Sequence, residues 1–134
     1  MKYLLDTNIC IYIIKHNPPI VQKRFAKERP GDIAISSVSI AELYYGAEKS
    51  SLVDRNIISI QKFLQPLVAL QFNEEDAVSY GRVRAELERM GTPIGAMDLL
   101  IASQALSRGL TLVTNNVREF QRVGSLSIEN WTQA

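Results

Sequence analysis

Short apolar runs of strand length alternate with longer helical patterns along this chain, and this alternation limits the folds open to it. The apolar runs lie at residues 2–5, 33–36, 68–72 and 110–114, with a further candidate edge strand at 126–130. The candidate helices lie at 8–15, 20–28, 38–49, 53–64, 74–90 and 97–108, with a short turn near 117–122. Because parallel strands need crossover connections, this order predicts an α/β fold with a central, mainly parallel β-sheet flanked by α-helices.

The length of the chain indicates one domain. Its 134 residues show no repeat, linker or low-complexity tract, so we expect a single domain over residues 1–134 with one principal site. The longest uncharged apolar run, ICIYII, is far shorter than the ~20 residues that cross a bilayer, and no signal-peptide pattern is present. We therefore expect no membrane partner and a cytoplasmic location.

Charge and cysteine content exclude several kinds of site. The net charge is +1, so any nucleic-acid binding must come from local clusters or a bound metal rather than from a general attraction. With Cys10 as the single cysteine, an intrachain disulfide and a Cys-rich zinc site are excluded, and a buried structural thiol is the simplest interpretation. The single histidine, His16, lies at a helix end before Asn17-Pro18 and is interpreted as a surface residue.

Asp6 directly follows the first strand, in the sequence LLDTN. Asp, Thr and Asn are all favoured as helix N-caps, and the apolar stretch from Ile9 to Ile14 follows. Taken alone, Asp6 is better interpreted as a cap than as a metal ligand.

Glu42 follows the second strand within SSVSIAELYYGAEKS, where apolar residues recur with helical spacing. Ser39 and Glu42 fit the S-x-x-E capping box. Ser36 or Ser37 lies closer to the end of the strand and is at least as good a cap, which would place Glu42 inside the helix. Both interpretations stay open at this point.

Asp98 begins an apolar stripe in PIGAMDLLIASQALSRG. It shares a helix face with Ile101, Ala102 and Ala105, at spacings i+3, i+4 and i+7. A carboxylate near a helix N-terminus gains about 0.3–1 kcal/mol at exposed sites. Partial burial without partners costs more than this, so Asp98 indicates a site.

The stretch LTLVTNNVREF places Thr114, Asn115, Asn116 and Glu119 after the fourth strand. An Asx-rich turn leading into a short helix explains these residues when they are taken alone. In an open α/β sheet, however, residues just after parallel strands converge outside the carboxyl ends of the strands. Carboxylates brought together in this way raise one another's pKa unless a cation neutralises them. Oxygen-only ligands select a hard ion, Mg²⁺ or Mn²⁺.

The ordered set LLDTN, SSVSIAELYYGAEKS and RAELERMGTPIGAMDLLIASQALSRGLTLVTNNVREF resembles PIN-domain ribonucleases of the VapC toxin type, from Lys2 to about Trp131. The resemblance implies a PIN fold and Mg²⁺- or Mn²⁺-dependent endoribonuclease activity on structured RNA, such as tRNA, which inhibits translation. The catalytic and metal-binding acids that it implies are Asp6, Glu42, Asp98 and Glu119. Some PIN domains carry an aspartate where Asn116 stands, so whether Glu119 or Asn116 completes the site stays open.

Other implied roles follow from the same resemblance. Thr7, Asn8, Thr114 and Asn116 match polar motif positions that orient the carboxylates through hydrogen bonds. Family members of this type are usually homodimers and are inhibited by a cognate VapB-type antitoxin. Operator DNA would be bound only through that antitoxin, because this chain shows no DNA-binding domain.

Three basic residues are candidates for RNA binding. Arg118 and Arg122 flank Glu119, and Arg82 lies on the long helix, so these three are candidate RNA-phosphate contacts. Solvated helix faces are the alternative explanation for them.

A metal-dependent phosphohydrolase is one rival function, although Asn8 stands where an aspartyl phosphatase has its second aspartate. The other rival is a regulatory RNA-binding PIN domain without catalysis, which usually lacks one or more of the acids.

Overall fold

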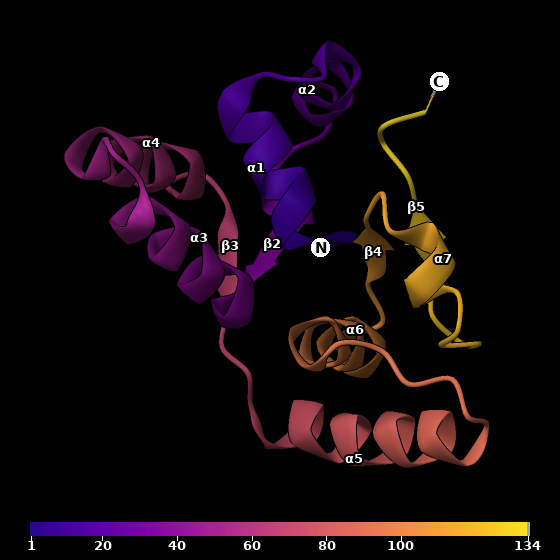
Figure 1. The fold of residues 1–134 in the computed structure, drawn as a ribbon. Helices are drawn as coiled ribbons and strands as arrows, with labels where there is room; N and C mark the ends of the chain where they lie inside the picture. The colour runs from indigo at the N-terminus through magenta and orange to yellow at the C-terminus, as the bar shows by residue number, and fades with distance from the viewer. Residues whose placement is uncertain (134) are drawn as a thin grey trace.

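Five short strands pair in parallel to form the central sheet of the computed structural model, which describes residues 1–133 (Figure 1). The strands are β1 (Tyr3–Leu5), β2 (Ile33–Ser36), β3 (Val68–Leu70), β4 (Thr111–Val113) and β5 (Ile128–Glu129). Their order across the sheet is β3-β2-β1-β4-β5. The predicted α/β class is confirmed, and every pairing in the sheet is parallel.

Within residues 1–133, seven α-helices and one short 3₁₀ helix connect the strands. The α-helices are α1 (Thr7–Lys15), α2 (Pro19–Ala26), α3 (Ser37–Lys49), α4 (Val53–Leu64), α5 (Glu74–Arg89), α6 (Ala96–Arg108) and α7 (Val117–Phe120), and the 3₁₀ helix is η1 (Pro30–Asp32). The α-helix ends lie within two residues of those predicted. No helix among the described residues has both the length and the apolar character needed to cross a membrane.

Helices cover both faces of the sheet, which explains why its strands are almost continuously apolar. On one face, Leu4, Ala34 and Leu112 pack against α5, α6 and α7. On the other face, Leu5 and Ile35 pack against α1 to α4. Figure 1 shows α5 and α6 side by side, and α3 contacts α6. Successive residues of β1, β2 and β4 therefore enter two separate cores.

Strand β3 ends two residues earlier than the predicted range 68–72. The backbone that follows makes other hydrogen bonds: the Gln71 carbonyl accepts from Arg108 at 2.9 Å, and the Phe72 N–H donates to Ser37 Oγ at 3.4 Å. Because these groups serve side chains, they do not extend the ladder to β2.

Two minor predictions from the sequence are confirmed. Cys10 is fully buried in α1, and burial, together with the nearby Asp6 carboxylate, raises the pKa of its thiol far above the ordinary value, so it packs as an apolar group. His16 is exposed and ends α1 with a left-handed backbone, φ 54°.

Candidate active site

Asp6 lies where β1 ends and α1 begins, and its side chain is only 4% exposed. Its Oδ1 accepts the Thr7 backbone N–H at 2.8 Å, and its Oδ2 accepts the Thr114 hydroxyl at 2.8 Å. Burial raises the pKa of Asp6; hydrogen bonds from Thr114 and Thr7 oppose the rise, and repulsion from Glu42 and Glu119 adds to it. Asp6 is therefore both a helix cap and a carboxylate that feels other acids, so its two interpretations are compatible.

Glu42 lies inside α3, and the capping-box interpretation of Ser39 and Glu42 is wrong. The helix begins at Ser37, with Ser36 as its N-cap accepting the Val38 N–H at 3.1 Å. Glu42 instead accepts the Thr7 hydroxyl at 2.6 Å, and the same hydroxyl lies 3.0 Å from Ser39 Oγ. Thr7 thus ties the start of α1 to the second turn of α3.

Asp98 lies in the first turn of α6 and is half-buried. The residues predicted to share its helix face, Ile101, Ala102 and Ala105, are completely buried against the sheet. Burial, followed by repulsion from Asp6 and Glu119, raises the pKa of Asp98 to about 7. This carboxyl group therefore lies in a field of negative charge.

Glu119 lies in α7 and connects it to the start of α6. Its Oε1 accepts the Gly95 backbone N–H at 2.8 Å, and its Oε2 accepts the Asn116 amide at 2.8 Å. The bond from Gly95 and that from Asn116 hold the pKa of Glu119 below its ordinary value. Asn116 also donates its backbone N–H to Thr114 Oγ1 at 2.9 Å.

The remaining predicted residues lie at the edge of this region or away from it. Asn8 is exposed, and within residues 1–133 its side chain makes no hydrogen bond to the acids. Arg118 and Arg82 are exposed. Arg122 donates to the Pro93 carbonyl at 2.8 Å, so part of its guanidinium holds the loop before α6.

The acids reach one region because β1, β2 and β4 are adjacent in the sheet and each delivers residues at its carboxyl end. Over residues 1–133, no Lys or Arg forms a salt bridge with Asp6, Glu42, Asp98 or Glu119. No three His, Cys, Asp or Glu side chains in that part of the chain are grouped so that they could hold a metal ion as they stand. An all-oxygen donor set fits a hard divalent ion.

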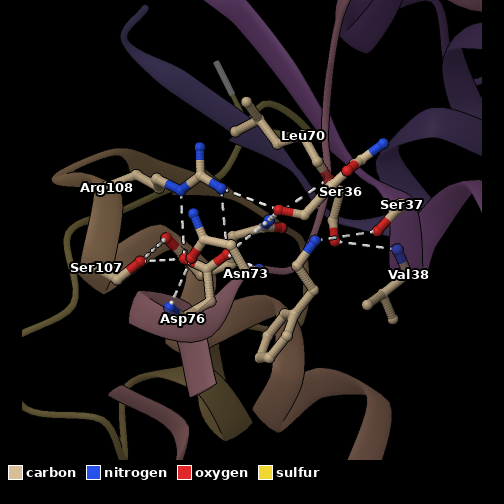
Figure 2. Close-up of polar contacts among 11 residues, drawn as sticks. Ser36, Ser37, Val38, Leu70, Asn73, Asp76, Ser107 and Arg108 are labelled. Atoms are coloured by element: carbon tan, nitrogen blue, oxygen red, sulfur yellow. Dashed lines mark hydrogen bonds and ion pairs between the residues drawn. The ribbon is translucent and has the colours of Figure 1, made fainter. Parts of the chain in front are cut away.

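A second buried carboxylate, Asp76, was not predicted from the sequence. It is completely buried in the first turn of α5 and accepts bonds from the Asn73 N–H at 2.9 Å, Arg108 Nε and Nη2 at 3.2 Å each, Gln104 Nε2 at 3.2 Å and the Ser107 hydroxyl (Figure 2). Burial raises the pKa of Asp76, but the bonds from Arg108, Ser107 and Asn73 outweigh it and hold the pKa below its ordinary value. The Asn-x-x-Asp capping box was a local signal for this cluster, but its partners on α6 had none.

Comparison with known proteins identifies the family of this chain. A family model described as the PIN domain matches residues 3–126. The tRNA(fMet)-specific endonuclease VapC of Shigella flexneri is 48% identical over 132 residues, which cover 98% of this chain and 99% of the relative. Ribonuclease VapC2 of Haemophilus influenzae is 48% identical over 131 residues, 98% of each chain.

Solved structures agree with these relatives. A chain of DNA-bound VapBC from Salmonella typhimurium superposes with a TM-score of 0.92 at 44% identity, covering 98% of both chains. A chain of VapBC2 from Rickettsia felis, bound to a promoter DNA fragment, gives 0.91 at 42% identity, covering 98% of this chain and 99% of the other. The chain therefore belongs to the PIN-domain family, within its group of VapC ribonucleases.

Proposed function

We propose that this protein is the toxin of a type II toxin–antitoxin system and a divalent-metal-dependent endoribonuclease that cleaves structured RNA, with tRNA as the substrate class. The observation that carries the proposal is the acidic centre, defined as Asp6, Glu42, Asp98 and Glu119. Burial, with added repulsion from Asp6 and Glu119, raises the pKa of Asp98 in this centre to about 7. The similarity to the Shigella relative, a tRNA(fMet)-specific endonuclease, supports tRNA as the substrate class.

Asp6 and Asp98 are proposed to bind the ion directly, and Glu42 and Glu119 to complete the site. When bound, Mg²⁺ or Mn²⁺ supplies positive charge to the scissile phosphate and acidifies a nearby water. Thr114 holds Asp6 and Thr7 holds Glu42 through their hydroxyls, so these carboxylates keep their orientation. Asn116 does the same for Glu119.

Exposed arginines beside the acidic centre suit the phosphates that flank a cleavage site. Arg118 lies in α7 next to Glu119, and Arg122 lies just beyond the end of that helix. Within residues 1–133 neither arginine forms a salt bridge, so both can neutralise substrate phosphates and set the position of the RNA. Arg82, on α5, stays a weaker proposal because it lies on a different helix.

A VapB-type antitoxin is the proposed partner. A groove of about 250 Å³ between α1, α3 and α4 is lined by apolar residues, Ile11, Ile14, Leu43, Ala47 and Ile60, and includes Glu42. A peptide seated there would approach the acidic centre from the side of α3. The matching structures of VapBC, two of them bound to DNA, support an antitoxin that also carries operator binding. A homodimer and a cytoplasmic location stay predictions.

Cleavage of total tRNA by the purified chain, with Mg²⁺ or with EDTA, tests the proposal. We expect discrete cuts that require the metal, mapped by sequencing the new ends. RNA binding without cutting would instead support the regulatory RNA-binding alternative. Hydrolysis of small phosphate esters without cutting of tRNA would support the phosphohydrolase alternative. A matched preparation of Asp98→Asn controls for contaminating nucleases.

A further inference from the structure

A pocket of about 180 Å³ lies between the second half of α5, the connection that follows it and the start of α6. Its apolar floor consists of the buried Leu87 and Leu99 with the half-buried Ile94. Its polar rim consists of Tyr80, Arg84 and Glu88 from α5, and Pro93 and Ala96 complete the lining. The pocket is smaller than the sites that hold drug-sized ligands, so it suits a single flat ring system.

The pocket and the acidic centre are both bordered by the connection that leads into α6. Ile94 and Ala96 line it, and Gly95 between them donates its N–H to Glu119 at 2.8 Å. A Cβ placed on Gly95 would lie 3.7 Å from Asp98 Oδ2 and 3.6 Å from Glu119 Oε1. A chain of nucleotides that passes the acidic centre over Gly95 therefore meets the pocket next.

The rim offers stacking surfaces. The Arg84 guanidinium carbon lies 6.0 Å from the centre of the Tyr80 ring, and Arg84 Nη1 donates to the Tyr80 hydroxyl at 2.8 Å. Aromatic rings and guanidinium planes are the groups on which unpaired bases stack in protein–RNA complexes. Both side chains come from one face of α5, because their spacing is i to i+4.

The charge at the rim favours a base over a phosphate. Glu88 lies 3.2 Å from Arg84 Nε, so the positive charge is already balanced, and a phosphate at this point would meet a carboxylate. A carboxylate accepts hydrogen bonds from exocyclic amino groups such as N4 of cytosine. Uracil carries a carbonyl at that position and gives Glu88 no donor.

We propose that this pocket is a subsite for an unpaired nucleobase next to the cleaved bond, and that Glu88 selects bases with an exocyclic amino group. The proposal rests on the endoribonuclease function above, because the substrate strand links the two sites. The subsite itself needs no metal. Its ligand can therefore be tested as a free nucleoside.

Cytidine and uridine form a matched pair of probes, because they differ at the group that Glu88 would contact. Each is titrated at millimolar concentration into the ¹⁵N-labelled full chain in EDTA, and amide shifts are followed by NMR. We expect saturable shifts at Gly95, Ala96 and Leu99, with cytidine bound about fivefold tighter than uridine. Ala96→Trp, which fills the pocket from an exposed position, should abolish the shifts.

Substitution of two exposed glutamates on α5 distinguishes recognition of the base by Glu88 from a general effect of negative charge. Glu88→Met removes the acceptor and should erase the preference for cytidine, whereas Glu86→Met should keep it. The proposal is wrong if neither nucleoside gives saturable shifts, if both bind equally to the parent chain, or if the pocket amides respond only to the antitoxin. Failure of the proposed nuclease function would give a different result: the chain would still bind cytidine but would not cut tRNA.

Discussion

The carboxylate of Asp76 and those of the acidic centre have opposite surroundings. Asp76 is saturated by donors from α5 and α6, and these hold its pKa below the ordinary value. Asp98 has other carboxylates as neighbours, and its pKa is raised to about 7. Burial alone therefore does not mark a functional acid. The groups that surround the carboxylate distinguish the two cases. A carboxylate paired with cationic and hydroxyl donors stabilises the fold, whereas carboxylates that lack such donors can bind a cation.

Asp98→Asn gives the largest effect that this contrast predicts. Cleavage of tRNA should fall by more than about 100-fold, since loss of a proposed ligand should exceed the 10–100-fold cost of losing a partner behind one. The free energy of unfolding without metal should stay the same or rise, because a repelled charge is removed. Single-turnover cleavage and urea unfolding measure the two quantities. Cleavage within tenfold of the parent would contradict the assignment of Asp98.

Asp76→Ala should have the opposite consequence. We expect the free energy of unfolding to fall by about 2–3 kcal/mol, because Arg108, Gln104 and Ser107 lose a shared acceptor. The value lies below the range for fully buried pairs because the Arg108 side chain is 23% exposed and can reach water. Urea unfolding measures the change, and cleavage per folded molecule should be unaltered. Glu75→Ala, at an exposed position of the same helix turn, is the matched control and should change stability by less than about 0.5 kcal/mol.

Thr114→Val tests whether the acidic centre depends on its few hydrogen bonds. The substitution removes the hydroxyl that donates to Asp6 at 2.8 Å and accepts the Asn116 N–H. Metal affinity, measured by calorimetric titration with Mn²⁺, should fall about 10–100-fold. Thr114→Ser keeps the hydroxyl and should restore most of the affinity. Equal affinity in the two variants would show that the bond to Asp6 has no part in binding.

The two groups should also give opposite dependences of stability on pH. The folded pKa of Asp98 lies above its ordinary value of 3.8, so between 3.8 and about 7 the folded protein holds a proton that the unfolded chain has lost. Stability without metal should therefore fall as pH rises through this window, and Mg²⁺ or Asp98→Asn should reduce the fall. The folded pKa of Asp76 is lowered, so its contribution is present above 3.8 and lost as pH falls below it. Thermal unfolding of the parent and both variants across pH, with and without Mg²⁺, measures both slopes.

The sequence was sufficient to predict the fold class and the region of the acidic centre. Strand ends and helix periodicity are local signals, and parallel topology brings strand ends together, so Asp6, Glu42 and Asp98 could be placed at one edge of the sheet. The start of α3 was open because several serines compete as its cap, and the Ser36 geometry decides against the box at Ser39.

The Asp76 cluster could not be predicted for a different reason. Its capping box is local, but Arg108 lies 32 residues away on another helix, and only packing of α5 against α6 decides that the two meet. The bond from Gly95 to Glu119 was equally hidden, since a backbone N–H leaves no signature in the sequence.

The distribution of the acidic centre along the chain has a consequence for biosynthesis. Asp6 is made well before Glu119, and β4 joins the sheet by pairing with β1. A nascent chain that still lacks β4 and α7 therefore has an incomplete centre, however well its first helices have formed. On the proposed function, RNA cleavage should therefore begin only after β4 and α7 have joined the fold.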